Sequence, residues 1–176
     1  MNIFYLSSCP VDAASFHCDK HVVKMILEYA QLLSTAHHVL DGDDAPEGIY
    51  KCTHKNHPSA VWVRQSKANY LWTLDLLLHL LEEYQYRYKK IHKTSRLLLQ
   101  LNRVPMNIPD MGFTDPPQCM PDEYKCDDAV QAYRNYYNGD KASFAVWKYS
   151  ATPTWYTGIV VPKNISFNAE DYARVY

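Results

Sequence analysis

Polar residues recur every three or four positions through a long apolar stretch near the start of the chain. We call this set the polar seam: His17, His21, Lys24, Glu28, Gln31, Thr35 and His38. Apolar side chains fill the positions between them, at Val22, Val23, Ile26, Leu27, Ala30 and Leu33. Spacings of three and four place the two sets on opposite faces of an α-helix. The pattern predicts a helix near residues 11–39, with one face in a core and the seam facing either solvent or a site.

Apolar periodicity and turn residues predict three more helices further along the chain. A second long helix is expected at 59–90, a short one at 95–102, and a last one that Asp127 or Asp128 caps and Asn138 with Gly139 ends. Residues 41–48 have the composition of a loop, and the prolines between 105 and 121 exclude regular structure there. We therefore expect an all-α fold: one compact helical domain over residues 1–176, with two long packed helices, a proline-rich connection and an aromatic C-terminal segment.

The composition is that of a globular protein with one core. Hydrophobic residues make up 47% of the chain, charged residues 21%, and glycine only 5 positions, unlike disordered chains or turn-rich all-β folds. No apolar run is long enough to span a membrane, and the N-terminus lacks the pattern of a secretion signal. The five cysteines are an odd number, which favours reduced thiols. We expect a cytoplasmic protein with no membrane contact, and the oligomeric state stays open.

The net charge of -1 gives no overall attraction to nucleic acid, so a polyanion would need a local basic patch. Five of the 18 basic residues fall within ten positions: Arg87, Lys89, Lys90, Lys93 and Arg96. This basic cluster is either a polyanion-binding patch or a solvent-exposed helix end, where cations also complement the helix dipole.

The polar seam holds the strongest candidate chemistry, although an ordinary solvent-exposed helix face is the alternative. It combines three histidines, a lysine and one carboxylate, and such groups exchange protons near neutral pH. His21 and Glu28 lie two helical turns apart on one face, and a carboxylate there can stabilise an oxocarbenium-like sugar or activate a nucleophile. Cysteine and histidine also recur with metal-binding spacings at 18–21 and 52–57, but neither set is a complete tetrahedral one. We expect no metal and no cofactor.

A family resemblance rests on two specific parts of the sequence. One is Asp19-Lys20-His21 with Glu28 seven positions after the histidine, and the other is the run Pro153-Thr154-Trp155-Tyr156. Together they resemble the pyrimidine-dimer DNA glycosylases of T-even bacteriophages. The resemblance implies an all-α enzyme whose own α-amine attacks sugar C1′, expels the base and forms a Schiff base. It also implies that Glu28 is essential, that His21 lies beside it, and that Trp155 and Tyr156 stack on a nucleobase.

The chain departs from the family pattern at the nucleophile and at the phosphate contacts. Asn2 is larger than the residues that permit removal of an initiator Met, so the amine is that of Met1 or, after removal, of Asn2. An α-amine is partly neutral at pH 7, unlike a lysine. Leu27 and Gln31 stand where family arginines contact phosphates, which favours a smaller substrate. Water activated by the carboxylate, or Lys24, is the alternative nucleophile.

Two classes of function remain open. The first is an enzyme that cleaves an N-glycosidic bond in DNA or a nucleotide, with AP-lyase activity as an extension, and the second is a non-catalytic nucleotide or nucleotide-signal binding protein that uses the same pocket. The catalytic candidates are Glu28, His21, Met1 and Asn2, and the substrate-binding candidates are Lys20, Lys24, His17, Gln31, His57, Lys67, Trp155 and Tyr156. The carboxylate favours the enzyme, because a carboxylate facing a phosphate pocket is costly unless the reaction uses it.

Overall fold

The computed structural model describes residues 1–158, which contain helices and no strand. The α-helices are α1 (Pro10–Phe16), α2 (Asp19–Leu40), α3 (Pro58–Gln65), α4 (Lys67–Tyr88), α5 (Leu98–Leu101) and α6 (Ala129–Asn138). Short 3₁₀ turns lie at η1 (Gly42–Asp44), η2 (Lys93–Leu97) and η3 (Asp122–Tyr124). The predicted all-α fold is confirmed, and the last part of the expected domain, 159–176, lies outside the described residues. None of the helices within 1–158 combines the length and apolar character that crossing a bilayer requires.

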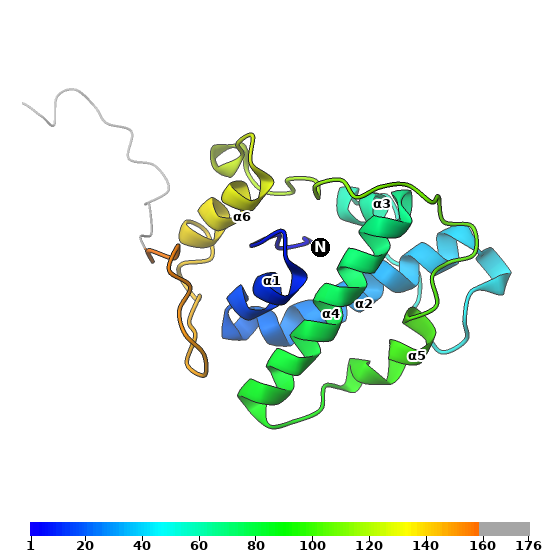
Figure 1. Cartoon of the computed structure of the whole chain (residues 1–176), viewed down its shortest axis with the longest axis horizontal. Helices are drawn as coiled ribbons and strands as arrows, with labels where there is room; N and C mark the ends of the chain where they lie inside the picture. The colour runs from blue at the N-terminus through cyan, green and yellow to red at the C-terminus, as the bar shows by residue number, and fades with distance from the viewer. Residues whose placement is uncertain (159–176) are drawn as a thin grey trace, which may run out of the picture.

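The two long helices, α2 and α4, pack against each other at the centre, as the sequence predicted (Figure 1). On α2 the predicted apolar residues Val22, Ile26 and Leu33 are buried, but Val23 and Leu27 are exposed. On α4 the buried apolar side chains include Leu76, Leu77 and Leu80. Packing of this apolar area supplies most of a helix's stability in water.

The expected helix at 11–39 is interrupted at His17 and Cys18, which separate α1 from α2. Both residues have extended backbone, with ψ angles of 130° and 159°. The cause lies far along the chain, because the buried guanidinium of Arg87 donates hydrogen bonds to the carbonyl oxygens of Ser15 and His17 and to the Asp19 carboxylate. The last carbonyl groups of a helix have no hydrogen-bond donor within the helix, and the Arg87 guanidinium supplies the donors here.

The expected helix at 59–90 is likewise two helices, α3 and α4, with a break at Ser66. The Ser66 hydroxyl caps α4 by accepting from the Ala68 N–H at 3.1 Å, and it also lies 2.8 Å from the carbonyl oxygen of Gly112 in the proline-rich connection. Serine is a favoured N-cap, so this boundary has a local signal that apolar periodicity alone hides.

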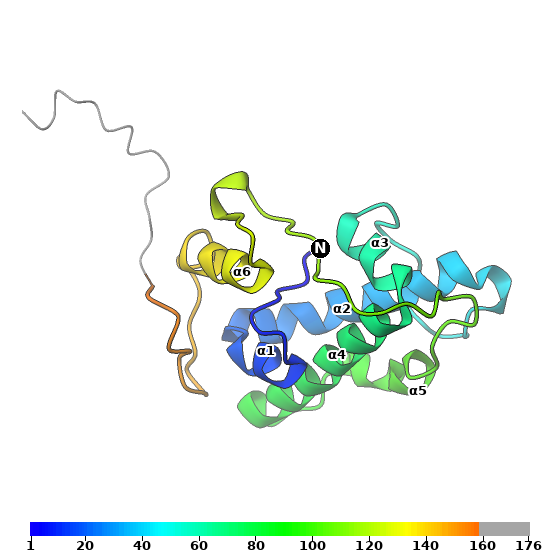
Figure 2. The same cartoon turned by 45° about the horizontal axis from the view of Figure 1, so that its top comes forward.

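The N-terminal segment, Ile3 to Leu6, is buried without regular secondary structure, and it lies between α6 and α3 in both views (Figures 1 and 2). Its backbone is fixed on α2, where the Phe4 N–H donates to the Tyr29 hydroxyl at 3.1 Å. The start of the chain is therefore held beside the middle of α2.

Candidate functional site

The structure divides the polar seam into two parts, of which the first is buried. His17 lies in the core, with Nδ1 2.6 Å from the Ala13 carbonyl oxygen and Nε2 2.8 Å from the Tyr29 hydroxyl. Because a carbonyl only accepts, Nδ1 carries the proton and Nε2 accepts from Tyr29. Burial is the main cause that lowers the His17 pKa, to about 4. His17 therefore supports the site from inside and is not exposed to a substrate.

His21 is also buried, and it joins the N-terminal segment to α6. Its ring stacks on Phe4 at a centroid distance of 4.3 Å, and its Nδ1 lies 2.5 Å from the Tyr137 hydroxyl. Burial is the first cause that lowers the His21 pKa, to about 2, and His17 and nearby lysines add to it. A neutral imidazole does not deliver a proton at neutral pH, so this geometry favours an orienting role over a proton-donating one.

Glu28 belongs to the second, partly exposed part of the seam. Its side chain is 15% exposed, and Oε1 lies 3.2 Å from Nζ of Lys24, whose side chain is 65% exposed. An i,i+4 pair of this kind contributes only about 0.3–0.5 kcal/mol in water, so Lys24 can exchange the carboxylate for another partner at little cost.

The amino terminus of Met1 and the carboxylate of Glu28 both act on the imidazole of His57. Partial burial is the main cause that lowers the pKa of His57, the N-terminal ammonium and His54 lower it further, and Glu28 raises it. Met1 itself is half-buried against the core. The N-terminal segment is fixed on α2 beside Glu28, and α3 packs on the same helix. Met1, Glu28 and His57 from these three segments are the candidate site.

The backbone of α3 fixes which ring nitrogen of neutral His57 carries the proton. His57 is the N-cap of α3, and its Nδ1 accepts the N–H of Ser59 at 3.2 Å. In the neutral ring the proton is therefore on Nε2, which leaves an N–H donor on the side of the ring away from the helix.

The other predicted substrate contacts occupy different places. Lys20 is exposed, with Nζ 4.6 Å from the centre of the Phe144 ring, Gln31 is half-buried one turn after Glu28, and Lys67 is exposed at the start of α4. Asn2 is half-buried next to the N-terminal residue. Of this group, Lys20, Gln31 and Asn2 lie on the segments that form the candidate site.

Trp155 and Tyr156 are packed against other rings and do not present an open stacking surface. Trp155 contacts the Arg134 guanidinium at 5.3 Å from the ring centre and Phe16 edge-on at 5.9 Å. Tyr156 packs on Trp147 at 4.6 Å. Both residues hold the segment after α6 against α1 and α6.

Lys141, on the turn after α6, lies near the seam. Together with Lys20 and Lys24 it lowers the His21 pKa, after burial and His17. Its Nζ is 4.2 Å from the centre of the Tyr136 ring. No local pattern marks it, because only the packing of α6 brings this turn to the start of α2.

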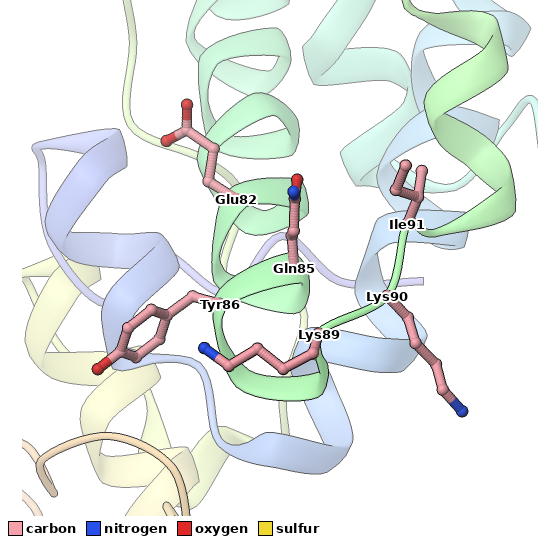
Figure 3. Close-up of a pocket in the computed structure, with 6 residues that line it drawn as sticks. All are labelled: Glu82, Gln85, Tyr86, Lys89, Lys90 and Ile91. Carbon is pink, nitrogen blue, oxygen red and sulfur yellow. The ribbon is translucent and has the colours of Figure 1, made fainter.

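The basic cluster is divided by the structure, because Arg87 is buried and paired with Asp19 and Glu83. The hollow at the C-terminal end of α4 has a volume of about 710 Å³ and is lined by Glu82, Gln85, Tyr86, Lys89, Lys90 and Ile91 (Figure 3). Lys89 extends toward Tyr86, with Nζ 4.7 Å from the ring centre, and Lys90 points away from it (Figure 3). This hollow lies at the end of α4 away from α3 and His57.

A second hollow, of about 450 Å³, lies along α3. Its lining residues are Asn56, Pro58, Val61, Trp62, Gln65, Thr114, Asp115 and Pro117. Two of them, Asn56 and Pro58, flank His57 in the chain, so the hollow is next to the candidate site. Glu28 lines neither of the two hollows.

Within residues 1–158 no group of three or more histidine, cysteine or acidic side chains is arranged to hold a metal ion. Comparison of the chain with known protein families, with curated protein sequences and with solved structures finds no match. The function is therefore argued from the site itself.

Proposed function

We propose that this protein cleaves an N-glycosidic bond in DNA or in a nucleotide, with Glu28 as the essential carboxylate. One arrangement carries the proposal: the N-terminal segment is fixed on α2 at Tyr29, the residue after Glu28, and α3, which His57 caps, packs on the same helix. Such chemistry uses an amine together with a carboxylate, and the resemblance in sequence names the same glutamate.

In the proposed reaction the α-amine of Met1 forms a bond to sugar C1′ as the bond from C1′ to the base nitrogen breaks. The base leaves with the bonding electrons and takes up a proton, and the amine gives up a proton to the carboxylate of Glu28. The sugar ring then opens to a Schiff base, which water hydrolyses to regenerate the amine. The carboxylate also stabilises the positive charge that develops on the sugar. If Glu28 activates water in place of the amine, no covalent intermediate forms.

The other residues have simpler roles in the proposal. The Nε2–H of His57 donates a hydrogen bond to a sugar oxygen or phosphate beside the carboxylate. Lys20 and Lys24 contact phosphate, and the hollow along α3 receives the base. His17 and His21 hold the N-terminal segment in place through Tyr29 and Phe4.

A non-catalytic nucleotide-binding protein is the second candidate. The observation that favours it is the Lys24–Glu28 ion pair, which gives the carboxylate a partner without any reaction. In such a protein the lysines bind phosphate and Glu28 only orients Lys24.

The two candidates are separated by incubating the protein with damaged and undamaged duplexes, single strands and nucleoside phosphates, with and without borohydride. Released base with a trapped covalent adduct indicates the amine mechanism, and released base without an adduct indicates activated water. A variant with two residues added before Met1 displaces the amine, so adduct formation should disappear in it. If the protein binds nucleotides but releases no base from any of the substrates, the proposed enzymatic activity is wrong and the nucleotide-binding function is supported.

A further inference from the structure

The hollow along α3 is bordered by the proline-rich connection. We call residues 109–115 of this connection the strap, which runs beside α3 and the start of α4 (Figures 1 and 2). The Pro109 carbonyl accepts the first N–H of α4 at 2.9 Å. Near the other end, the Asn69 side chain accepts the Thr114 N–H at 3.1 Å, and the Trp62 indole N–H donates to the Thr114 carbonyl at 3.0 Å. The strap is therefore fixed on α3 and α4 near both of its ends.

Asp115 is the last residue of the strap, and it is exposed and lines the hollow. Its carboxylate interacts with the buried phenol of Tyr5, in the N-terminal segment. Burial is the main cause that raises the Tyr5 pKa, to about 12, and Asp115 raises it further through its charge and a hydrogen bond. The Tyr5 hydroxyl is therefore protonated at neutral pH, so it donates this hydrogen bond and the carboxylate accepts it. The N-terminal segment thus holds the carboxylate at the hollow.

Most of the hydrogen-bonding capacity of the Asp115 carboxylate is left for a ligand. A carboxylate accepts about four hydrogen bonds on its two oxygens, and Tyr5 uses one of them. Among residues 1–158 no lysine, arginine or histidine forms an ion pair with Asp115. Because the ionised group only accepts, it favours a ligand edge with N–H donors and repels an edge with carbonyl oxygens.

The rest of the hollow suits a flat ring. Apolar surface comes from Pro58, Val61, Trp62 and Pro117. Surfaces of this kind contact the faces of a nucleobase and leave its polar edge to hydrogen-bonding side chains. Asn56 lines the same hollow, and its amide supplies a donor as well as an acceptor.

We propose that the hollow along α3 selects guanine, with the two oxygens of Asp115 accepting from N1–H and the 2-amino group of the base. This inference rests on the proposed function, which assigns the hollow to the base, and it adds which base. Guanine presents two adjacent N–H donors on its pairing edge, and they match the two oxygens of a carboxylate. Adenine, cytosine and thymine each place an acceptor on that edge against the carboxylate. The Asn56 amide is the donor for O6 of guanine.

The test measures equilibrium binding of GMP, of inosine monophosphate (IMP), which lacks only the 2-amino group, and of xanthosine monophosphate (XMP), which has a carbonyl in its place. The unaltered full chain should bind GMP at least about tenfold more tightly than IMP or XMP. Asp115→Asn replaces an acceptor oxygen by an amide donor, which suits the 2-carbonyl of XMP. The ratio of GMP affinity to XMP affinity should therefore fall by about tenfold or more. Asp110→Asn makes the same change at an exposed residue of the strap that does not line the hollow, and it should alter this ratio by less than about twofold.

The ratio is taken within each variant, so a general loss of folding lowers both affinities and does not imitate the exchange. Equal affinity of the unaltered protein for GMP and IMP, no measurable binding of GMP, or an unchanged ratio in Asp115→Asn would overturn the guanine assignment. If Asp115→Asn binds neither GMP nor XMP, the preference of the unaltered protein for GMP over IMP decides the result.

The failure of this inference is distinct from that of the proposed function. Base release with no preference for GMP removes only the guanine assignment. A preference for GMP that depends on Asp115, without base release on any substrate, removes only the enzyme.

Discussion

The two parts of the polar seam have the same spacing and residue character but different surroundings. His17 and His21 lie under the N-terminal segment, hydrogen-bonded to Tyr29 and Tyr137, and are neutral. Lys24 and Glu28, one and two turns further, are not covered in this way and keep partly exposed charged groups. One amphipathic pattern can therefore supply both a buried support and a partly exposed charged pair. What separates them is which segment packs over each part.

The largest effect on the buried part is expected from Arg87→Met. This change leaves the Asp19 carboxylate without its buried partner and removes three donors from the junction of α1 and α2. We expect the free energy of unfolding to fall by about 3–5 kcal/mol in chemical denaturation. Arg96→Met, at an exposed position, is the matched control and should cost less than about 0.5 kcal/mol. Similar losses in the two variants would contradict the role of Arg87.

The pH dependence of stability should reveal the buried histidines of the polar seam. His17 and His21 have pKa values of about 4 and about 2 in the folded protein, below the ordinary value of 6.5. Below pH 6.5 the unfolded chain therefore binds more protons than the folded one, so stability is fully present above that pH and is lost as the pH falls. Urea unfolding should show a loss of roughly 2 kcal/mol per histidine between about pH 7 and about pH 5.

The control for the pH prediction is His21→Asn, which removes one of the two buried imidazoles. Its free energy of unfolding should fall by less over the same pH range than that of the unaltered protein. The difference should equal the contribution of one histidine. An unchanged slope in this variant would show that other groups cause the acid sensitivity.

His21→Leu tests the support role at neutral pH. It removes the partner of the Tyr137 hydroxyl and the ring that stacks on Phe4. A buried hydroxyl without its partner costs about 1–3 kcal/mol, so the thermal midpoint should fall clearly. His79→Leu, which breaks a solvent-exposed pair with Glu82, should lower stability by at most about 1 kcal/mol. If His21→Leu were as mild as this control, the support role would be wrong.

Glu28→Gln should have the smallest effect on stability, within about 0.5 kcal/mol, because Lys24 is a weak and exposed partner. Its expected effect is on chemistry: base release should fall by about 100-fold or more, while binding of nucleotides stays. Glu47→Gln makes the same charge change in an exposed loop and should leave base release unchanged. Unaltered release in Glu28→Gln would contradict the assignment of the carboxylate.

Much of the fold was predictable from local signals. The apolar periodicity located both long helices, and Asp128 and Gly139 correctly bounded α6. The breaks at Cys18 and Ser66 were missed, because periodicity continues across them and the partners that stabilise them, Arg87 and Gly112, lie far along the chain. At the site, the face that carries Glu28 was predictable, but its proximity to His57 was not.

The sequence by itself determined that Val22, Ile26 and Leu33 share one face of a long helix, since side-chain spacing along a helix is a property of the backbone alone. It also placed Glu28 on the same face as His21. Only the tertiary structure decided that His21 is covered by Phe4 and that the N-terminal segment is fixed on α2 at Tyr29. These outcomes depend on contacts between segments distant in the chain, whose burial changes the charge and accessibility of a residue without changing the local pattern.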